Sequence, residues 1–191
     1  MQFTEGSIYH IYNRGNNKQR IFFKPENYSF FLHKVKKYLW PCSDILAWCL
    51  MPNHFHFLVC ANLQTRRLVK HSPIEINAFT EGIRLLLSSY TKAIQKQESI
   101  TGNLFQQKTK SKCVDDYALT AFNYIHQNPY RARLVKRLED WEFCSIGEYC
   151  HPSPESLCNR LKAFELLDIN PETFLEDAYA VIPENLAENI F

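Results

Sequence analysis

The stretch Met51-Pro52-Asn53-His54-Phe55-His56-Phe57-Leu58-Val59 decides how this chain folds. Successive side chains of a β-strand point to opposite faces, so His54 and His56 share one face while Phe55 and Phe57 share the other. Two imidazoles on one face of an apolar strand are costly to bury unless their nitrogens are bonded, and a divalent metal ion commonly bonds them. The stretch therefore predicts a core strand that offers two metal ligands.

The composition is that of one globular domain of ordinary size with an appendage. The chain has 191 residues, of which 46% are hydrophobic and 14% aromatic, enough for a sizeable core. No stretch approaches the roughly 18 apolar residues of a membrane-spanning helix. Residues 1–5 lack the basic and apolar character of a signal peptide, so we expect a cytoplasmic protein without a membrane partner. The seven cysteines form no CxxC pair and are expected to be reduced core residues rather than zinc ligands.

Charge is distributed unevenly along the chain. Residues 1–150 carry 20 Lys and Arg against 12 Asp and Glu, whereas residues 151–191 carry 2 against 8. A basic body followed by an acidic tail is typical of a domain that binds a polyanion and is joined to a separate element. We therefore predict two units, a basic domain over residues 1–150 and an acidic helical extension over residues 151–191.

The hydrophobic periodicity predicts an α+β fold. Strand, helix, strand, strand, helix, strand is the βαββαβ order of the ferredoxin-like fold, and it places the His strand in the middle of the sheet. Pro52-Asn53 forms the hairpin turn before that strand, a polar loop occupies residues 62–72, and an extra helix follows the last strand. The predicted ranges are strands at 7–13, 45–50 and 54–60, a basic loop that leads into the last strand over 104–114, and helices at 25–38, 73–96 and 115–128.

The extra helix supplies the candidate third ligand. Tyr124 and Asn128 are four residues apart and so lie on one helix face. Asn128 precedes a proline, which predicts that the helix ends there. Its amide oxygen is an acceptable hard ligand beside two imidazoles, with Gln127 as the alternative and His126 pointing away. The other histidines (His10, His33, His71 and His151) are expected to be ordinary surface or core residues.

Two imidazoles and an amide leave coordination positions open, as catalysis requires. Oxygen ligands suit Mg²⁺ or Mn²⁺, and imidazoles favour Mn²⁺ or Zn²⁺. Such an ion can stabilise the charge of a phosphoryl transition state, with the phenol of Tyr124 as the nucleophile. Tyr117, seven residues earlier, is the rival nucleophile. Because a free phenol titrates near pH ~10, another group must accept its proton.

These motifs resemble those of one known family. His54-Phe55-His56 is similar to the HUH motif of single-tyrosine transposases. Tyr124-Ile125-His126-Gln127-Asn128-Pro129 is similar to the signature of their branch called REP-associated tyrosine transposases. The ordered set covers about residues 5–150. Its further members are Tyr9-His10, Asn13-Arg14-Gly15-Asn16-Asn17, Met51-Pro52-Asn53, Phe105-Gln106, Arg131-Ala132-Arg133-Leu134-Val135 and Trp141.

The resemblance implies a metal-dependent transposase that cuts and rejoins single-stranded DNA. It implies that His54, His56 and Asn128 bind Mg²⁺ or Mn²⁺ and that Tyr124 forms a 5′-phosphotyrosine link. The implied substrate is an imperfect hairpin, and a homodimer is a family expectation. The candidate phosphate contacts, which should be sensitive to salt and blind to sequence, are Arg14, Lys18, Lys108, Lys110, Lys112, Arg131 and Arg133.

Two other functions and one departure from the family stay open at this point. The chain could be a phosphodiesterase in which metal-activated water attacks, or a DNA-hairpin-binding protein without catalysis. The acidic tail, for which the family offers no motif, could pack as an extra lobe, cover the basic groove or make a dimer contact.

Overall fold

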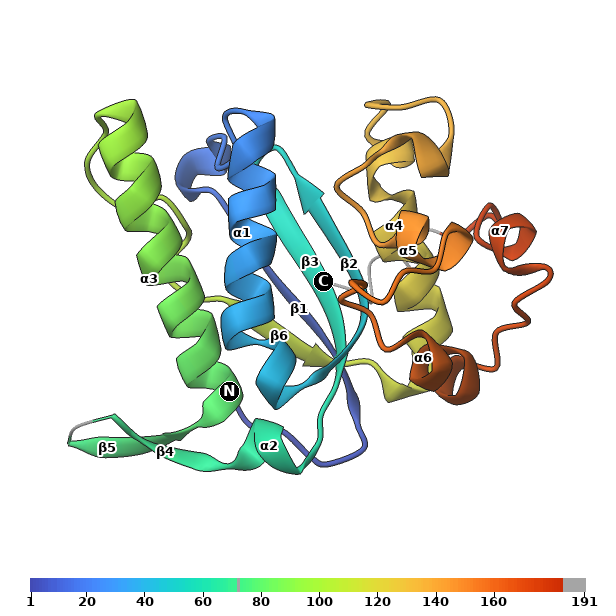
Figure 1. Cartoon of the computed structure of the whole chain (residues 1–191), viewed down its shortest axis with the longest axis horizontal. Coiled ribbons are helices and arrows are strands. Elements are labelled where there is room, and N and C mark those ends of the chain that lie inside the picture. Colours follow the sequence, from blue (N-terminus) through green and yellow to red (C-terminus); the bar gives the residue numbers. More distant parts are fainter. Residues whose placement is uncertain (72, 184–191) are drawn as a thin grey trace.

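A four-stranded antiparallel sheet forms the centre of the computed structural model, which describes residues 1–71 and 73–183 (Figure 1). Strand β3 pairs with β2 on one side and with β1 on the other, and β6 pairs with the outer side of β1. This order confirms the α+β ferredoxin-like core with the His strand inside the sheet. Across the sheet the strands are β2 (Asp44–Met51), β3 (His54–Cys60), β1 (Ile8–Arg14) and β6 (Lys110–Cys113).

The predicted hairpin joins β2 to β3. Pro52 and Asn53 make the turn, and the register places Met51 opposite His54 and Leu50 opposite Phe55. A shift of one residue would exchange the faces of every side chain on β3. The turn therefore fixes which side of the sheet receives the histidines.

Helices cover both faces of the sheet (Figure 1). On the phenylalanine face lie α1 (Pro25–Tyr38) and α3 (Ala78–Glu98), and Phe31 of α1 contacts the rings of Phe55 and Phe57. The two helices pack closely at Gly82, where an added Cβ would lie 2.4 Å from the carbonyl oxygen of Tyr38. On the other face lies α4 (Ala118–Arg131), so this helix packs over the histidines.

Helix α3 begins later than the sequence predicts. Residues 68–71 and 74–77 form a hairpin of two strands, β4 (Leu68–His71) and β5 (Ile74–Asn77), instead of the polar loop and first helical turn expected there. The alternation of residues 74–77 suits a strand, and Asn77 then caps the helix by accepting a hydrogen bond from the Thr80 amide at 2.8 Å. The prediction of a helix start at Pro73 is therefore wrong.

Helix α4 continues past the proline at which it was predicted to end. Pro129 lies inside the helix, which runs to Arg131. Pro129 is close to the C-terminal end of the helix and removes only one N–H from the helical hydrogen bonds. Because most of the helix lies before Pro129, the remaining hydrogen bonds are kept. The end is closed by Ala132 donating to the Asn128 carbonyl and Leu134 donating to the Pro129 carbonyl, both at 2.9 Å.

The segment after α4 packs first against the β2 edge of the sheet and then against the outer side of α4. It begins to pair with β2 where the Ser145 amide donates to the Trp48 carbonyl at 2.9 Å, and Phe174 contacts the ring of Phe122 on α4. We call the described residues 151–183 the C-terminal lobe; residues 184–191 of the expected extension lie outside the described residues. Helix α5 (Ile146–Cys150) precedes the C-terminal lobe, which contains α6 (Arg160–Leu167) and α7 (Phe174–Asp177).

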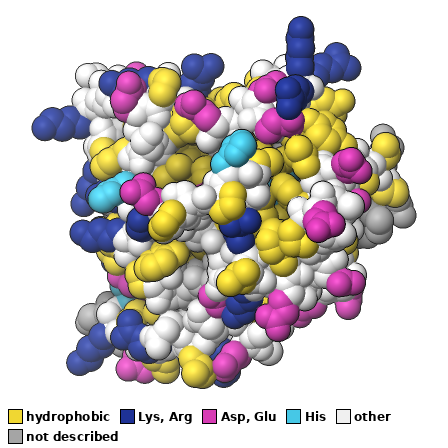
Figure 2. Space-filling model, turned by 45° about the vertical axis from the view of Figure 1, so that its right-hand side comes forward, with side chains coloured by type: hydrophobic (Ala, Val, Ile, Leu, Met, Phe, Trp, Pro, Cys, Tyr) yellow, Lys and Arg dark blue, Asp and Glu magenta, His cyan; other side chains and the backbone are white. Residues whose placement is uncertain are grey.

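Figure 2 views the molecule from the side of the C-terminal lobe. Asp and Glu side chains are scattered over most of this face, including its right-hand and lower parts, and Lys and Arg side chains project from its left margin and from its top. None of the helices in the described ranges is long and apolar enough to cross a membrane. The remaining short elements are α2 (Leu63–Arg66) and the 3-10 turns η1 (Asn16–Lys18), η2 (Trp40–Cys42), η3 (Asp115–Tyr117) and η4 (Leu138–Asp140).

Candidate active site

A hollow of about 630 Å³ opens between α4 and the sheet. The β1–β3 register places Tyr12 opposite His56 and Arg14 opposite His54, so these four side chains share the face that α4 covers. Tyr124 and Asn128 of α4 complete the hollow. Its other lining residues are Asn13, Lys18, Asn53, Gln106, Lys108 and Lys110.

His54 is held by the turn that precedes it. Its Nδ1 lies 2.7 Å from the side-chain oxygen of Asn53, and the Asn53 amide nitrogen in turn donates to the Lys18 carbonyl. Burial lowers the pKa of His54 to about 4; an interaction with the Asn128 side chain opposes this shift, and the charge of Arg14 adds to it. The ring is therefore neutral near pH 7, as a metal ligand must be.

His56 is fully inside the protein and contacts another histidine. Its Nδ1 lies 2.8 Å from Nε2 of His10, and the two rings are stacked with centroids 5.0 Å apart. Burial lowers the pKa of His56 well below its usual value, and the neighbouring His10 and His54 lower it further. Both proposed ligands thus engage neighbours through Nδ1, so an ion held by both rings would be bound through Nε2.

Tyr124 and Asn128 point from α4 toward this pair. The Tyr124 ring meets the His56 ring edge-on at 6.4 Å, and the Arg131 guanidinium lies over the Tyr124 ring at 5.6 Å. Burial raises the pKa of Tyr124, and Arg131 opposes that shift, so the phenol keeps its proton near pH 7. The Asn128 amide nitrogen donates to the Tyr124 carbonyl at 3.0 Å, which leaves its amide oxygen as the ligand atom.

The alternatives on and near α4 point elsewhere. Gln127 donates to the carbonyls of Ala178 and Ala180 in the C-terminal lobe, both at 2.8 Å. His126 is buried with Nε2 2.8 Å from the Ser145 hydroxyl, on the far side of the helix. The Tyr117 hydroxyl donates to the Cys113 carbonyl at 3.4 Å, and Tyr117 does not line the hollow. Of the two tyrosines considered, only Tyr124 lies beside the histidines.

The residues around the hollow fit a divalent metal ion. Two neutral imidazoles and an amide oxygen form a mixed nitrogen and oxygen donor set that Mn²⁺ and Mg²⁺ accept. Within the described ranges no group of three or more His, Cys, Asp or Glu could hold a metal ion. A third protein ligand beside His54 and His56 would therefore have to be of another residue type, and the amide of Asn128 lines the same hollow.

Four of the seven cations predicted to contact phosphate line the same hollow: Arg14, Lys18, Lys108 and Lys110. Lys112 lies on β6 opposite His10, and Arg131 covers the Tyr124 ring. The seventh, Arg133, lies beyond the end of α4 and lines a separate hollow with Tyr130.

Sequence reasoning missed His10 and Asn53. His10 was expected to be an ordinary residue, yet it lies at the back of the site against His56. The signal that could have found it is the alternation of His10, Tyr12 and Arg14, which puts all three on one face of the strand that pairs with β3. Asn53 was identified as a turn residue and as part of a motif, but its side-chain oxygen also lies 2.7 Å from Nδ1 of His54.

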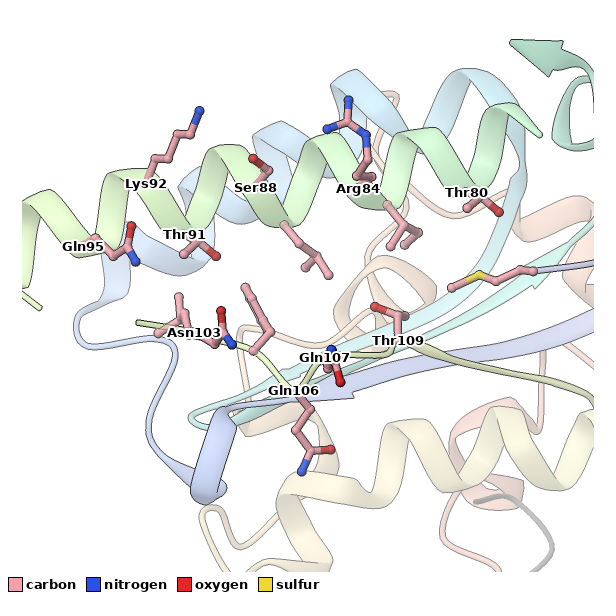
Figure 3. Close-up of a pocket in the computed structure, with 15 residues that line it drawn as sticks. Thr80, Arg84, Ser88, Thr91, Lys92, Gln95, Asn103, Gln106, Gln107 and Thr109 are labelled. Carbon is pink, nitrogen blue, oxygen red and sulfur yellow. The ribbon is translucent and has the colours of Figure 1, made fainter. Parts of the chain in front are cut away.

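A second hollow of about 570 Å³ lies between α3 and residues 103–109 (Figure 3). Its lining includes hydroxyl and amide side chains such as Thr91, Gln107 and Thr109, but no histidine or tyrosine. Gln106 borders both hollows, and Figure 3 shows its side chain pointing away from α3. Residues 103–109 thus form a wall that the two hollows share.

No protein-family model matches the chain, and no curated protein matches its sequence. Among solved structures it is similar to that of the REP-associated tyrosine transposase bound to a REP hairpin. The TM-score is 0.61 at 17% sequence identity, and the match covers 82% of this chain and 87% of that chain. At this level of identity the similarity shows a common fold.

Proposed function

We propose that the chain is a metal-dependent tyrosine transposase that cleaves and rejoins single-stranded DNA at hairpin-forming sequences. One observation supports this above all others: a tyrosine on α4 and two neutral histidines on β3 line one hollow together with four cations. The shared fold with a hairpin-bound transposase agrees with it.

In this proposal His54, His56 and the amide oxygen of Asn128 hold Mg²⁺ or Mn²⁺. The bound ion would supply positive charge to stabilise the phosphoryl group during transfer. The Nδ1 atoms of the two rings lie within hydrogen-bonding distance of Asn53 and His10. Because burial keeps both rings neutral near pH 7, no proton has to leave them before an ion binds.

The Tyr124 oxygen attacks the scissile phosphorus, and the bond from phosphorus to the 3′ oxygen breaks. The tyrosine proton passes to a base, the departing 3′ oxygen takes up a proton, and the products are a 5′-phosphotyrosine and a free 3′-hydroxyl. Attack by another 3′-hydroxyl reverses these steps and rejoins a strand. Arg131 over the Tyr124 ring favours the phenolate, because its charge lowers the phenol pKa against the effect of burial.

The DNA strand would cross the hollow along its basic edge. Arg14, Lys18, Lys108 and Lys110 neutralise phosphates without reading sequence, so binding should weaken as salt increases. Lys112, Arg131 and Arg133 would extend this contact toward β6 and the end of α4.

The test is a covalent adduct between the protein and a hairpin-bearing single-stranded oligonucleotide, in Mn²⁺, resolved on a denaturing gel. Wild type should form the adduct, and Tyr124→Phe should abolish it while binding the oligonucleotide as wild type does. Tyr117→Phe is the matched control and should retain the adduct.

Two results would reject the proposal. Cleavage without any adduct in wild type, unchanged in Tyr124→Phe, would mean that activated water is the nucleophile. Tight hairpin binding that neither cleaves nor responds to a chelator would mean that the protein only binds DNA.

A further inference from the structure

His10 is a fully buried side chain on β1 that contacts one proposed metal ligand. Its Nε2 lies 2.8 Å from Nδ1 of His56, and its ring stacks on His56 and on Tyr12, with centroids 5.0 Å and 4.7 Å away. Tyr12 lies directly opposite His56 on the neighbouring strand. His10 is two residues before Tyr12, so it lies diagonally across from His56 on the same face of the sheet. The contact is thus set by the β1–β3 register.

The short distance between two imidazole nitrogens restricts how both rings are used. Each neutral imidazole ring has one N–H group and one acceptor nitrogen. In a hydrogen bond between two neutral rings, one of the two facing nitrogens therefore donates and the other accepts. If His56 binds an ion through Nε2, its Nδ1 carries the proton and Nε2 of His10 accepts it. That bond also occupies Nε2 of His10, so this nitrogen cannot be a ligand of the same ion.

We propose that His10 is a positioning residue of the metal site, whose Nε2 accepts the Nδ1–H of His56 and fixes the tautomer and orientation of that ring. The inference rests on the proposed function, in which His56 is a ligand. Asn53 holds His54 in the same manner, with its oxygen 2.7 Å from Nδ1. Each ligand on β3 therefore has its own acceptor, one from the neighbouring strand and one from the preceding turn.

The loss of such an outer partner typically costs about 10–100-fold in metal affinity. His10→Leu removes the acceptor and replaces it with an apolar side chain of similar bulk. We expect this variant to bind Mn²⁺ about 10–100-fold more weakly than wild type. His10→Gln, whose amide oxygen can replace Nε2 as acceptor, should bind Mn²⁺ within a few fold of wild type.

Two measurements are made on the full chain without DNA. Electron paramagnetic resonance titration of free Mn²⁺ gives the dissociation constant. Two-bond ¹H–¹⁵N correlation spectra of the metal-free protein give the tautomer of His56, which should be Nδ1–H in wild type and His10→Gln, and mixed or reversed in His10→Leu. His33→Gln, at an exposed position of α1, is the matched control and should change neither result.

Thermal unfolding of each variant identifies any that fails to fold, and His10→Gln then carries the comparison. The positioning role is overturned if folded His10→Leu binds Mn²⁺ like wild type with an unchanged His56 tautomer, while His54→Ala loses binding. The metal site itself, and with it the proposed function, fails if wild type and His54→Ala bind Mn²⁺ equally weakly.

Discussion

Asn128 and Gln127 are adjacent amides on α4 that point in different directions. Asn128 lines the hollow beside His54, whereas Gln127 donates two hydrogen bonds to the backbone of the C-terminal lobe. They differ by one methylene group and by their direction around the helix. This makes them a matched pair for deciding which amide belongs to the site.

Asn128→Ala should weaken Mn²⁺ binding by at least about tenfold, because it removes one of three ligands. Gln127→Ala should leave Mn²⁺ affinity within about twofold and lower the free energy of unfolding by about 1–3 kcal/mol, since the carbonyls of Ala178 and Ala180 lose their donor. Isothermal titration with Mn²⁺ and urea denaturation measure the two effects. A weaker metal affinity in Gln127→Ala alone would reverse the ligand choice.

The sequence was sufficient to select His54, His56, Tyr124 and Asn128, which line one hollow, but not other lining residues such as Tyr12. Period-two alternation placed His54 and His56 together, and the spacing of four placed Tyr124 above Asn128. His10 was noted as part of a motif but given no site role, because its contact depends on strand register, which links it to a residue 46 positions away. A single strand pattern does not encode its partner's register.

Helices α1 and α3 meet where a glycine allows backbone contact. A Cβ at Gly82 would lie 2.4 Å from the Tyr38 carbonyl oxygen, so the backbone of α1 itself would have to move. We expect Gly82→Ala to destabilise the protein by about 1–3 kcal/mol, although alanine is the better helix former. The measurement is the midpoint and slope of urea unfolding.

Gly147 in α5 provides the control for this prediction. An added Cβ there would meet nothing within 4 Å. Gly147→Ala should therefore be neutral or stabilise the protein by up to about 1 kcal/mol, from helix propensity alone. Equal effects at the two positions would show that the close contact between α1 and α3 is unimportant.

Element types were easier to predict from this chain than element ends. The Pro52-Asn53 turn and the apolar stripe of α3 were identified correctly, since each pattern is local. The start of α3 was misplaced because Ile74 and Ile76 fit both a strand and a helix, and only pairing with β4 decides between them. The end of α4 was misplaced because Pro129 was taken as a stop.

At the scale of the whole molecule, one of the bonds that attach the C-terminal lobe to the sheet involves a carboxylate. Asp44, at the start of β2, accepts hydrogen bonds from Lys162 at 2.7 Å, from Asn159 at 3.0 Å and from Asn62 at 3.1 Å. Burial raises the pKa of Asp44, but these three bonds together lower it by more. The carboxylate therefore favours the folded state in its charged form.

The sign of the pH effect follows from that lowered pKa. The stabilisation by Asp44 is complete above the unfolded pKa of about 4 and is lost as the pH falls through the lower folded value. Asp44 and Lys162 form a partly exposed pair, so Asp44→Asn should lower the free energy of unfolding by about 1 kcal/mol at pH 7. The difference in unfolding free energy from wild type should become smaller as the pH is lowered toward about 2. Urea unfolding across that range measures it, with exposed Glu172→Gln as the control. A difference that stays constant with pH would contradict the assignment.

The position of the C-terminal lobe was not predictable from its acidity. The charge counts showed that the tail is acidic. They were equally compatible with an extra lobe, a cover over the basic groove and a dimer contact. The described residues 151–183 pack outside α4 and along β2, through bonds such as that from the Asn159 amide to the Ile45 carbonyl at 2.8 Å. Hydrogen bonds between main-chain atoms can be made by almost any residue type, so the sequence contains no pattern that predicts them.

The two hydrogen bonds of Gln127 have a consequence for how this protein can diverge. Both end on main-chain oxygens, so any amino acid whose backbone follows the same path could accept them. Ala178 is also restricted in size because it is buried, whereas Ala180 is exposed and has no such restriction. Mutations can therefore accumulate in this part of the lobe without releasing the tyrosine helix, and shape should persist there long after residue identity has been lost.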